Sequence, residues 1–208
     1  MHHRWKGILA ALTLWSSLVS HAEAAPREQL IPILSVTTDQ VPTGSVLYLK
    51  ALFEQRADHA GLSIRFAESP GRFSAMAMAS AERAIKQAAA ALELSTDSWS
   101  IELQVPYDGV TVSGDSLSAM VGVSISAMAQ GKTISAGHVL TGTLTDDGAI
   151  GPVGAVPLKV QAARFAKLRR VLVPHQQAVS QETDRRIPAR VEIAPVRSVP
   201  EALDALTR

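Results

Sequence analysis

Apolar and polar residues alternate along several short stretches of the first half of the chain, and this pattern predicts β-strands. We expect strands over residues 31–38 and 45–52, with a turn at residues 41–44 between them. Further strands are expected over residues 61–67 and 99–105, where large apolar side chains occupy every second position. The pattern indicates a sheet with one face packed against a core.

Two longer segments have sequences typical of helices. Residues 74–92 form an Ala-rich stretch after a break at residues 68–72, and Ala is the strongest helix former. Residues 116–130 are apolar nearly all round, which predicts a buried helix that ends at Gly131. The remaining expected elements are a loop over 106–115, strands over 139–145, 170–173 and 190–193, an irregular or strand-like segment over 150–156, and helices over 158–167 and 199–206.

These elements predict one domain of the α+β class, a single mixed α/β unit that covers residues 25–208. The 208 residues suit one ordinary domain, and we find no internal repeat and no long linker. The charge-rich stretch 182–190 is expected to be a solvated loop.

The first 24 residues have the three-part pattern of a secretory signal peptide. Arg4 and Lys6 precede an apolar run over residues 7–19, and Ala22-Glu23-Ala24 is a small-x-small cleavage site. We therefore expect cleavage after Ala24 and a periplasmic or secreted mature protein. An uncleaved anchor or a buried helix are the alternatives, although the run is short for a membrane span.

Composition excludes several kinds of site. The chain has no Cys, so it forms neither disulfides nor thiolate metal sites. Its 20 basic and 19 acidic residues are nearly balanced, which argues against nucleic acid as a partner. The His residues have no metal-ligand spacing, and no Gly-x-x-x-x-Gly-Lys-Ser/Thr loop for a nucleotide is present. We expect no cofactor.

The loop Ser113-Gly114-Asp115-Ser116 precedes the expected buried helix and contains a candidate nucleophile. A Ser at this position gains from the N–H groups and the positive dipole end of a helix. Those N–H groups could also stabilise an oxyanion. The alternative is that Ser116 only caps the helix, which is a common role for Ser.

Lys159 is the second candidate, because Val156, Pro157, Leu158 and Val160 surround it in sequence. An apolar environment lowers the pKa of a Lys, and only a neutral Lys can act as a general base. The alternative is an ordinary exposed Lys on a helix.

The arrangement of these residues resembles the proteolytic domain of Lon proteases. Val105-Pro106 precedes Ser116 by a ten-residue loop, Thr141-Gly142 follows the apolar helix, and Lys159 follows Ser116 by 43 positions, as in that family. The Ala162-Ala163 pair and the strand from Val171 to Pro174 also match. The similarity is specific from Ser116 onward and weaker over the first 70 mature residues.

This resemblance implies a fold of the ribosomal-protein-type left-handed βαβ superfold and a serine endopeptidase with a Ser116–Lys159 dyad. Thr141 would position the Lys159 ammonium, and backbone N–H groups of Gly114, Asp115 and Ser116 would bind the oxyanion. The implied partner is an unfolded peptide or protein, cleaved without ATP, and a homo-oligomer is compatible with the family. Ser118 is a second candidate nucleophile on the same turn.

The sequence departs from the family around the nucleophile. The family has Pro-Ser-Ala-Gly where this chain has Asp115-Ser116-Leu117-Ser118, and Thr143 replaces a Glu. The first alternative function is therefore a catalytically weak or inactive Lon-like domain that binds peptides or proteins. The second is a small-molecule kinase of similar fold, in which the Gly/Ser loop would cradle phosphate.

Overall fold

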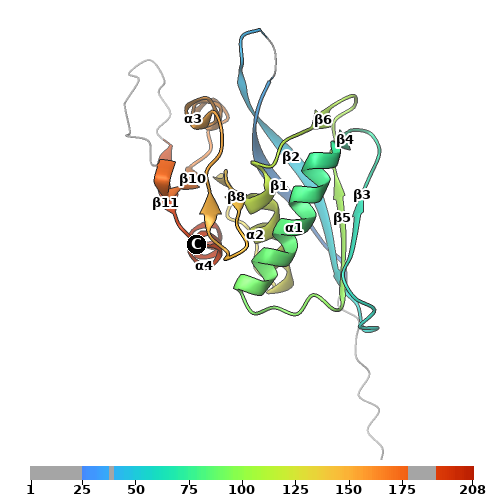
Figure 1. Cartoon of the computed structure of the whole chain (residues 1–208). Coiled ribbons are helices and arrows are strands. Elements are labelled where there is room, and N and C mark those ends of the chain that lie inside the picture. Colours follow the sequence, from blue (N-terminus) through green and yellow to red (C-terminus); the bar gives the residue numbers. More distant parts are fainter. Residues whose placement is uncertain (1–24, 38–39, 178–190) are drawn as a thin grey trace, which may run out of the picture.

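The structure is a computed structural model that describes residues 25–37, 40–177 and 191–208, and this part is a mixed α/β arrangement (Figure 1). The expected signal peptide at residues 1–24 and the charge-rich stretch 182–190 lie outside the described residues, as do Thr38 and Arg190 at the ends of two predicted strands. No helix within the described ranges is long and apolar enough to cross a membrane.

The first layer is a four-stranded sheet with the order β1-β2-β5-β3. It consists of β1 (Arg27–Val36), β2 (Gly44–Gln55), β5 (Trp99–Gln104) and β3 (Ser63–Phe66). The pairs β1–β2 and β2–β5 are antiparallel, whereas β3 and β5 run parallel. Alternation along β5 buries Trp99, Ile101 and Leu103, so one face of the sheet carries the main core, as the sequence predicted.

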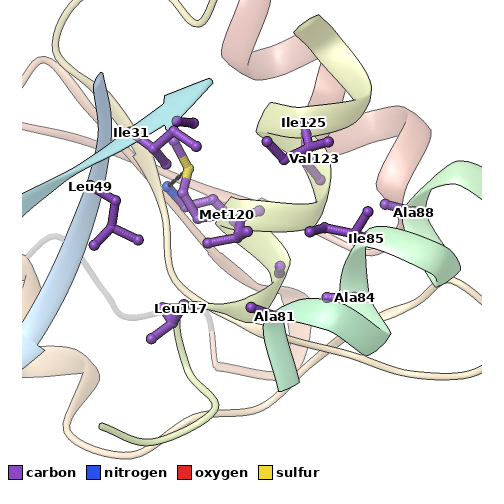
Figure 2. Packing of buried hydrophobic residues seen from close by; sticks show 14 of the residues in the cluster. Ile31, Leu49, Ala81, Ala84, Ile85, Ala88, Leu117, Met120, Val123 and Ile125 are labelled. Carbon is purple, nitrogen blue, oxygen red and sulfur yellow. Dashed lines mark hydrogen bonds between the residues drawn. The ribbon is translucent and has the colours of Figure 1, made fainter. Parts of the chain in front are cut away.

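Helices α1 (Ala75–Ala91) and α2 (Ser118–Ala129) pack closely against each other and over this sheet (Figure 2). Ser74 caps α1 by accepting a hydrogen bond from the Ala77 N–H group. A Cβ atom added to Gly122 of α2 would lie 2.5 Å from the Ala84 carbonyl oxygen of α1. The small residues of both helices therefore permit a backbone approach that larger side chains would prevent.

A second sheet contains three parallel strands in the order β11-β10-β7. These are β7 (His138–Leu140), β10 (Arg170–Pro174) and β11 (Glu192–Val196). Helices α3 (Val156–Phe165) and α4 (Val199–Thr207) lie on opposite sides of this sheet (Figure 1). Val171 and Val173 of β10 face α3, while Leu172 faces the main core with α4.

Four short strands form two small pairs outside these sheets. Strand β4 (Arg72–Phe73) pairs in parallel with β6 (Thr111–Val112), which lies inside the predicted loop 106–115. Strands β8 (Thr143–Leu144) and β9 (Ile150–Gly151) form an antiparallel pair, and a 3₁₀ turn follows β10 at His175–Gln177. The β4–β6 pair was not predicted, because strands of two residues carry no periodic pattern. Strands β8 and β9 lie within the segments predicted as a strand (139–145) and as irregular or strand-like (150–156).

Two predicted elements differ from the structure next to the candidate site. The helix predicted over 116–130 begins at Ser118, because the Ser116 carbonyl accepts the Gly142 N–H instead of a helical N–H. The strand predicted over 139–145 is divided at Thr141 and Gly142, since their backbone groups bond to Leu172 of β10 and to residues 116 and 119. A tertiary contact between these two segments therefore changes both elements.

Candidate active site

Ser116 lies in a tight turn just before α2, and it is half-buried. The N-cap residue of α2 is Leu117, which makes no side-chain capping hydrogen bond, so the capping alternative for Ser116 is wrong. Gly114 has φ +87°, a backbone conformation that favours glycine, and it allows the chain to turn before the Ser. The Ser116 hydroxyl is therefore not used to cap α2.

Two backbone hydrogen bonds attach this turn to the segment between β7 and β8. The Gly142 N–H donates to the Ser116 carbonyl over 3.1 Å, and the Ala119 N–H donates to the Gly142 carbonyl over 3.1 Å. A Cβ atom on Gly142 would lie 2.6 Å from Cγ2 of Ile150, so a larger residue here would displace either Ile150 or the segment that bonds to the Ser116 turn. The Thr141-Gly142 pair, noted in the sequence, therefore positions the backbone of Ser116.

Lys159 lies on the first turn of α3, and its side chain points into the protein. The residue is 4% exposed, so the alternative of an ordinary exposed Lys is wrong. Its Nζ atom donates a hydrogen bond to Oγ1 of Thr141 over 3.1 Å, a contact that the family resemblance implied. Thr141 Oγ1 in turn lies 3.5 Å from the Ser116 carbonyl oxygen, so one buried Thr links the Lys to the backbone of the Ser.

Burial determines the electrostatics of Lys159. Desolvation of the ammonium lowers the pKa of Lys159 to about 8, while the negative charge of Asp115 acts in the opposite direction. A Lys with a pKa near 8 is neutral in roughly a tenth of molecules at pH 7 and in about half at pH 8. Such a Lys is able to accept a proton near neutral pH.

Ser116 and Lys159 both line a cavity of about 280 Å³. The cavity lies between β1, the loop before α2 and the start of α3, and its other lining residues are Ile33, Leu34, Ser35, Val36, Val112, Ser113, Asp115, Leu117, Gly154 and Ala155. The loop before α2 brings a hydroxyl and an acid to this cavity, α3 brings a buried amine, and β1 borders all three. Such a convergence of polar groups on a cleft is typical of an active site.

The residues that depart from the family pattern lie in different environments. Ser118 is 3% exposed and does not line the cavity, which favours Ser116 over Ser118 as nucleophile. Leu117 is 4% exposed and its side chain belongs to the main core. Asp115 is exposed at the cavity and is therefore the altered residue that a bound molecule would meet.

Sequence reasoning did not assign the contribution of β1 to the cavity. Ile33 to Val36 lie about 80 positions before Ser116, and nothing in an alternating strand indicates which site it will border. Gly44 was also missed: a Cβ atom there would lie 2.2 Å from the Leu158 carbonyl oxygen of α3. The sequence shows a glycine at the end of the predicted turn, but it does not indicate that α3 packs against this residue.

Comparison with known proteins agrees with this geometry. Residues 68–208 match the family model described as the Lon protease (S16) C-terminal proteolytic domain. The chain belongs to this family. The matched region includes Ser116, Thr141 and Lys159 together with all four helices of the described structure.

Individual relatives cover part of this Lon-type chain. The archaeal Lon protease of Methanothermobacter thermautotrophicus is 32% identical over 104 residues, which are 50% of this chain and 16% of that protein. The archaeal Lon protease of Archaeoglobus fulgidus is 30% identical over 98 residues, 47% of this chain and 16% of the relative. The peroxisomal Lon protease homolog 2 of Danio rerio is 31% identical over 91 residues, 44% and 10% of the respective lengths. The chain thus matches only a small part of each of these proteins.

Within the described residues, no group of three or more His, Asp or Glu side chains could hold a metal ion. The chemistry available to this Lon-type cavity from its own residues is that of a hydroxyl and a buried amine that line the same cavity.

Proposed function

We propose that this chain is an exported, ATP-independent serine endopeptidase of the Lon type, with Ser116 as nucleophile and Lys159 as general base. One observation carries the proposal: the buried Lys159, which has a pKa near 8, lines the same cavity as Ser116 and is linked to its backbone through Thr141. The left-handed βαβ connection implied by the family remains a prediction.

In this mechanism neutral Lys159 removes the proton of Ser116, and the Ser116 oxygen attacks the carbonyl carbon of a peptide bond. Backbone N–H groups of Gly114, Asp115 and Ser116 stabilise the oxyanion of the tetrahedral intermediate. The Lys159 ammonium then returns its proton to the departing amine, which leaves an ester between Ser116 and the acyl part. Lys159 next takes a proton from water, and the hydroxide formed attacks the ester carbonyl. The Lys159 ammonium returns that proton to the Ser116 oxygen as the ester bond breaks, which releases the acid and restores the free enzyme.

Strand β1 offers a way to bind an extended peptide. It is the terminal strand of its sheet, and among the described residues its second edge pairs with no strand. Residues 33–36 of this strand line the cavity beside Ser116. A peptide that adds to the free edge would satisfy its backbone groups and present one carbonyl to the nucleophile, and this requires an unfolded substrate.

The test uses the mature chain with a fluorophosphonate probe and unfolded casein. We expect the wild type to be labelled on Ser116 and to cleave casein, with a loss of at least about a thousandfold in Ser116→Ala and Lys159→Ala. Ser100→Ala and Lys86→Ala, both outside the cavity, serve as matched controls. An unlabelled Ser116 at every pH would overturn the assignment.

The pH profile gives a second arm of this test. Because the conjugate acid of the base has a pKa near 8, kcat/KM should rise about tenfold per pH unit below pH 7 and level off above about pH 8.5. A profile that is flat between pH 6 and 9 would exclude Lys159 as the titrating base.

Export is tested separately. The signal-peptide pattern predicts that N-terminal sequencing of protein from the natural host begins at Ala25. Protein that retains residues 1–24 and fractionates with membranes would support the anchor alternative.

The second candidate function is a Lon-like domain that binds peptides without efficient cleavage. The exposed carboxylate of Asp115, directly beside the nucleophile, is the observation that favours it, since the charge opposes deprotonation of Lys159. Saturable peptide binding together with absent labelling of Ser116 would distinguish this function from a peptidase.

A further inference from the structure

Asp115 occupies an unusual position among the residues of the cavity. It directly precedes Ser116, its side chain is exposed, and the ion pairs of the described residues do not include it. Among the described residues that line the cavity, the only other charged one is Lys159, which is 4% exposed and bound to Thr141. The accessible charge beside the nucleophile is therefore negative.

The other lining residues that the structure describes add no charge. Six of the other lining residues have aliphatic side chains (Ile33, Leu34, Val36, Val112, Leu117 and Ala155), and Ser35 and Ser113 are neutral. The exposed Asp115 carboxylate lies beside these aliphatic walls, so a cationic side chain at this position can form a charge-assisted hydrogen bond with it. The described lining therefore offers a cationic side chain a charge partner that a neutral side chain cannot use.

We propose that Asp115 is a specificity residue of this site, which selects peptides with a Lys or Arg side chain close to the bond that is cleaved. The inference rests on the proposed peptidase function and deepens it by naming the substrate class. Electrostatic complementarity of this kind changes preference between partners more than it changes overall binding.

The same contact connects substrate choice to the base. The carboxylate of Asp115 raises the pKa of Lys159 against the effect of burial. A substrate cation paired with Asp115 offsets that charge and adds a positive charge near Lys159, so Lys159 loses its proton more readily. A basic peptide should therefore be cleaved with a lower pH midpoint than a neutral peptide.

The test compares peptides that carry a single Lys, or norleucine in its place, at each of the two positions on either side of the cleaved bond. We measure kcat/KM with the full mature chain, its Asp115→Asn and Asp115→Glu variants, and Asp108→Asn as a control. Asp108 is an exposed acid in the same loop that does not line the cavity. Thermal unfolding of each variant confirms that the variant is folded.

At one peptide position we expect the wild type and Asp108→Asn to prefer Lys about tenfold, mainly through KM. Asp115→Asn should reduce this ratio to below about twofold, and Asp115→Glu should retain part of it. In the wild type the pH midpoint of kcat with the Lys peptide should lie lower than with the norleucine peptide, and in Asp115→Asn the two midpoints should be closer together.

A Lys preference that is absent from the wild type, or that persists in Asp115→Asn, would overturn the inference. The outcome is separable from the proposed function by the fluorophosphonate probe. Labelling of Ser116 without a Lys preference rejects only the role of Asp115, whereas a wild type that neither reacts with the probe nor cleaves any peptide rejects both.

Discussion

The two hydrophobic clusters of this protein differ in construction, and the candidate dyad joins them. The larger cluster packs α1, α2 and α4 between the sheets and contains Leu117, next to Ser116. The smaller cluster packs α3 on the outer face of the parallel sheet and contains Val156 and Val160, on either side of Lys159. The candidate nucleophile Ser116 and the candidate base Lys159 are therefore positioned by two different hydrophobic clusters.

Strand β1 lies between these two clusters. Ile33 faces the larger cluster and Leu34 the smaller one, since neighbouring side chains of a strand point to opposite faces. In the larger cluster, small residues allow α1 and α2 to approach closely. In the smaller cluster, α3 contributes one apolar face, and its Phe165 is exposed. Changes in the larger cluster should thus affect global stability most, and changes at α3 should affect the dyad.

The largest effect on stability is expected from Gly122→Ala in the larger cluster. The new methyl group would lie 2.5 Å from the Ala84 carbonyl oxygen and 3.2 Å from the Cβ atom of Ala88. Overpacking of this kind costs about 3 kcal/mol, which lowers the melting temperature of a domain of this size by roughly 10 °C. Calorimetry measures the change, and Gly154→Ala, where no atom lies within 4 Å of an added Cβ, is the control.

Lys159→Met should stabilise the protein while it abolishes cleavage. Lowering the pKa of Lys159 from 10.5 to about 8 costs at most about 3 kcal/mol of folding free energy, and this cost is complete below pH 8. The unfolded chain binds more protons than the folded one between pH 8 and 10.5. The stability of the wild type therefore rises over that range, relative to Lys159→Met.

Denaturant unfolding at pH 7 and at pH 10 measures this difference. The advantage of Lys159→Met should be smaller at pH 10, because part of the cost in the wild type is then relieved. Lys86→Met, on the exposed side of α1, should change stability by less than about 0.5 kcal/mol. A Lys159→Met variant that is less stable than the wild type at pH 7 would show that the bond to Thr141 outweighs desolvation.

Gly44→Ala should have the smallest effect on stability and a clear effect on activity. The new methyl group would lie 2.2 Å from the Leu158 carbonyl oxygen, so either the β1–β2 hairpin or α3 must move. A shift of α3 displaces Lys159, and we expect kcat/KM to fall about tenfold for a stability loss of about 1 kcal/mol. Thr43→Ala in the same turn is the control; equal losses of activity in both variants would argue against a displaced helix.

The predicted elements agree with the structure where the periodic pattern of a segment and the residues at its ends are sufficient to define it. The Ala-rich helix was predicted over 74–92 and runs from Ala75 to Ala91, with Ser74 as its cap. Strand β5 and helix α4 agree within one residue at each end. These segments have strong periodicity and clear ends, so neighbouring elements add little to their definition.

The predictions failed where backbone groups bond across the fold. Ser116 was placed at a helix start, and residues 139–145 were predicted as one strand. In the structure the Ser116 carbonyl and the Gly142 backbone bond to each other, which shortens the helix and divides the strand. A local pattern cannot reveal this, because the partners are about 25 positions apart and each segment alone would continue its regular structure.

The sequence by itself determined the α+β class, the Lon family and the spacing of Ser116, Thr141 and Lys159, because these depend on residue types at set positions along the chain. Only the tertiary structure decided that Lys159 is buried, that it contacts Thr141, and that β1 closes the cavity beside Ser116. The burial of Lys159 and its lowered pKa depend on neighbours that are distant in sequence and that only packing brings together. The sequence position of a Lys therefore does not determine the pKa of its side chain.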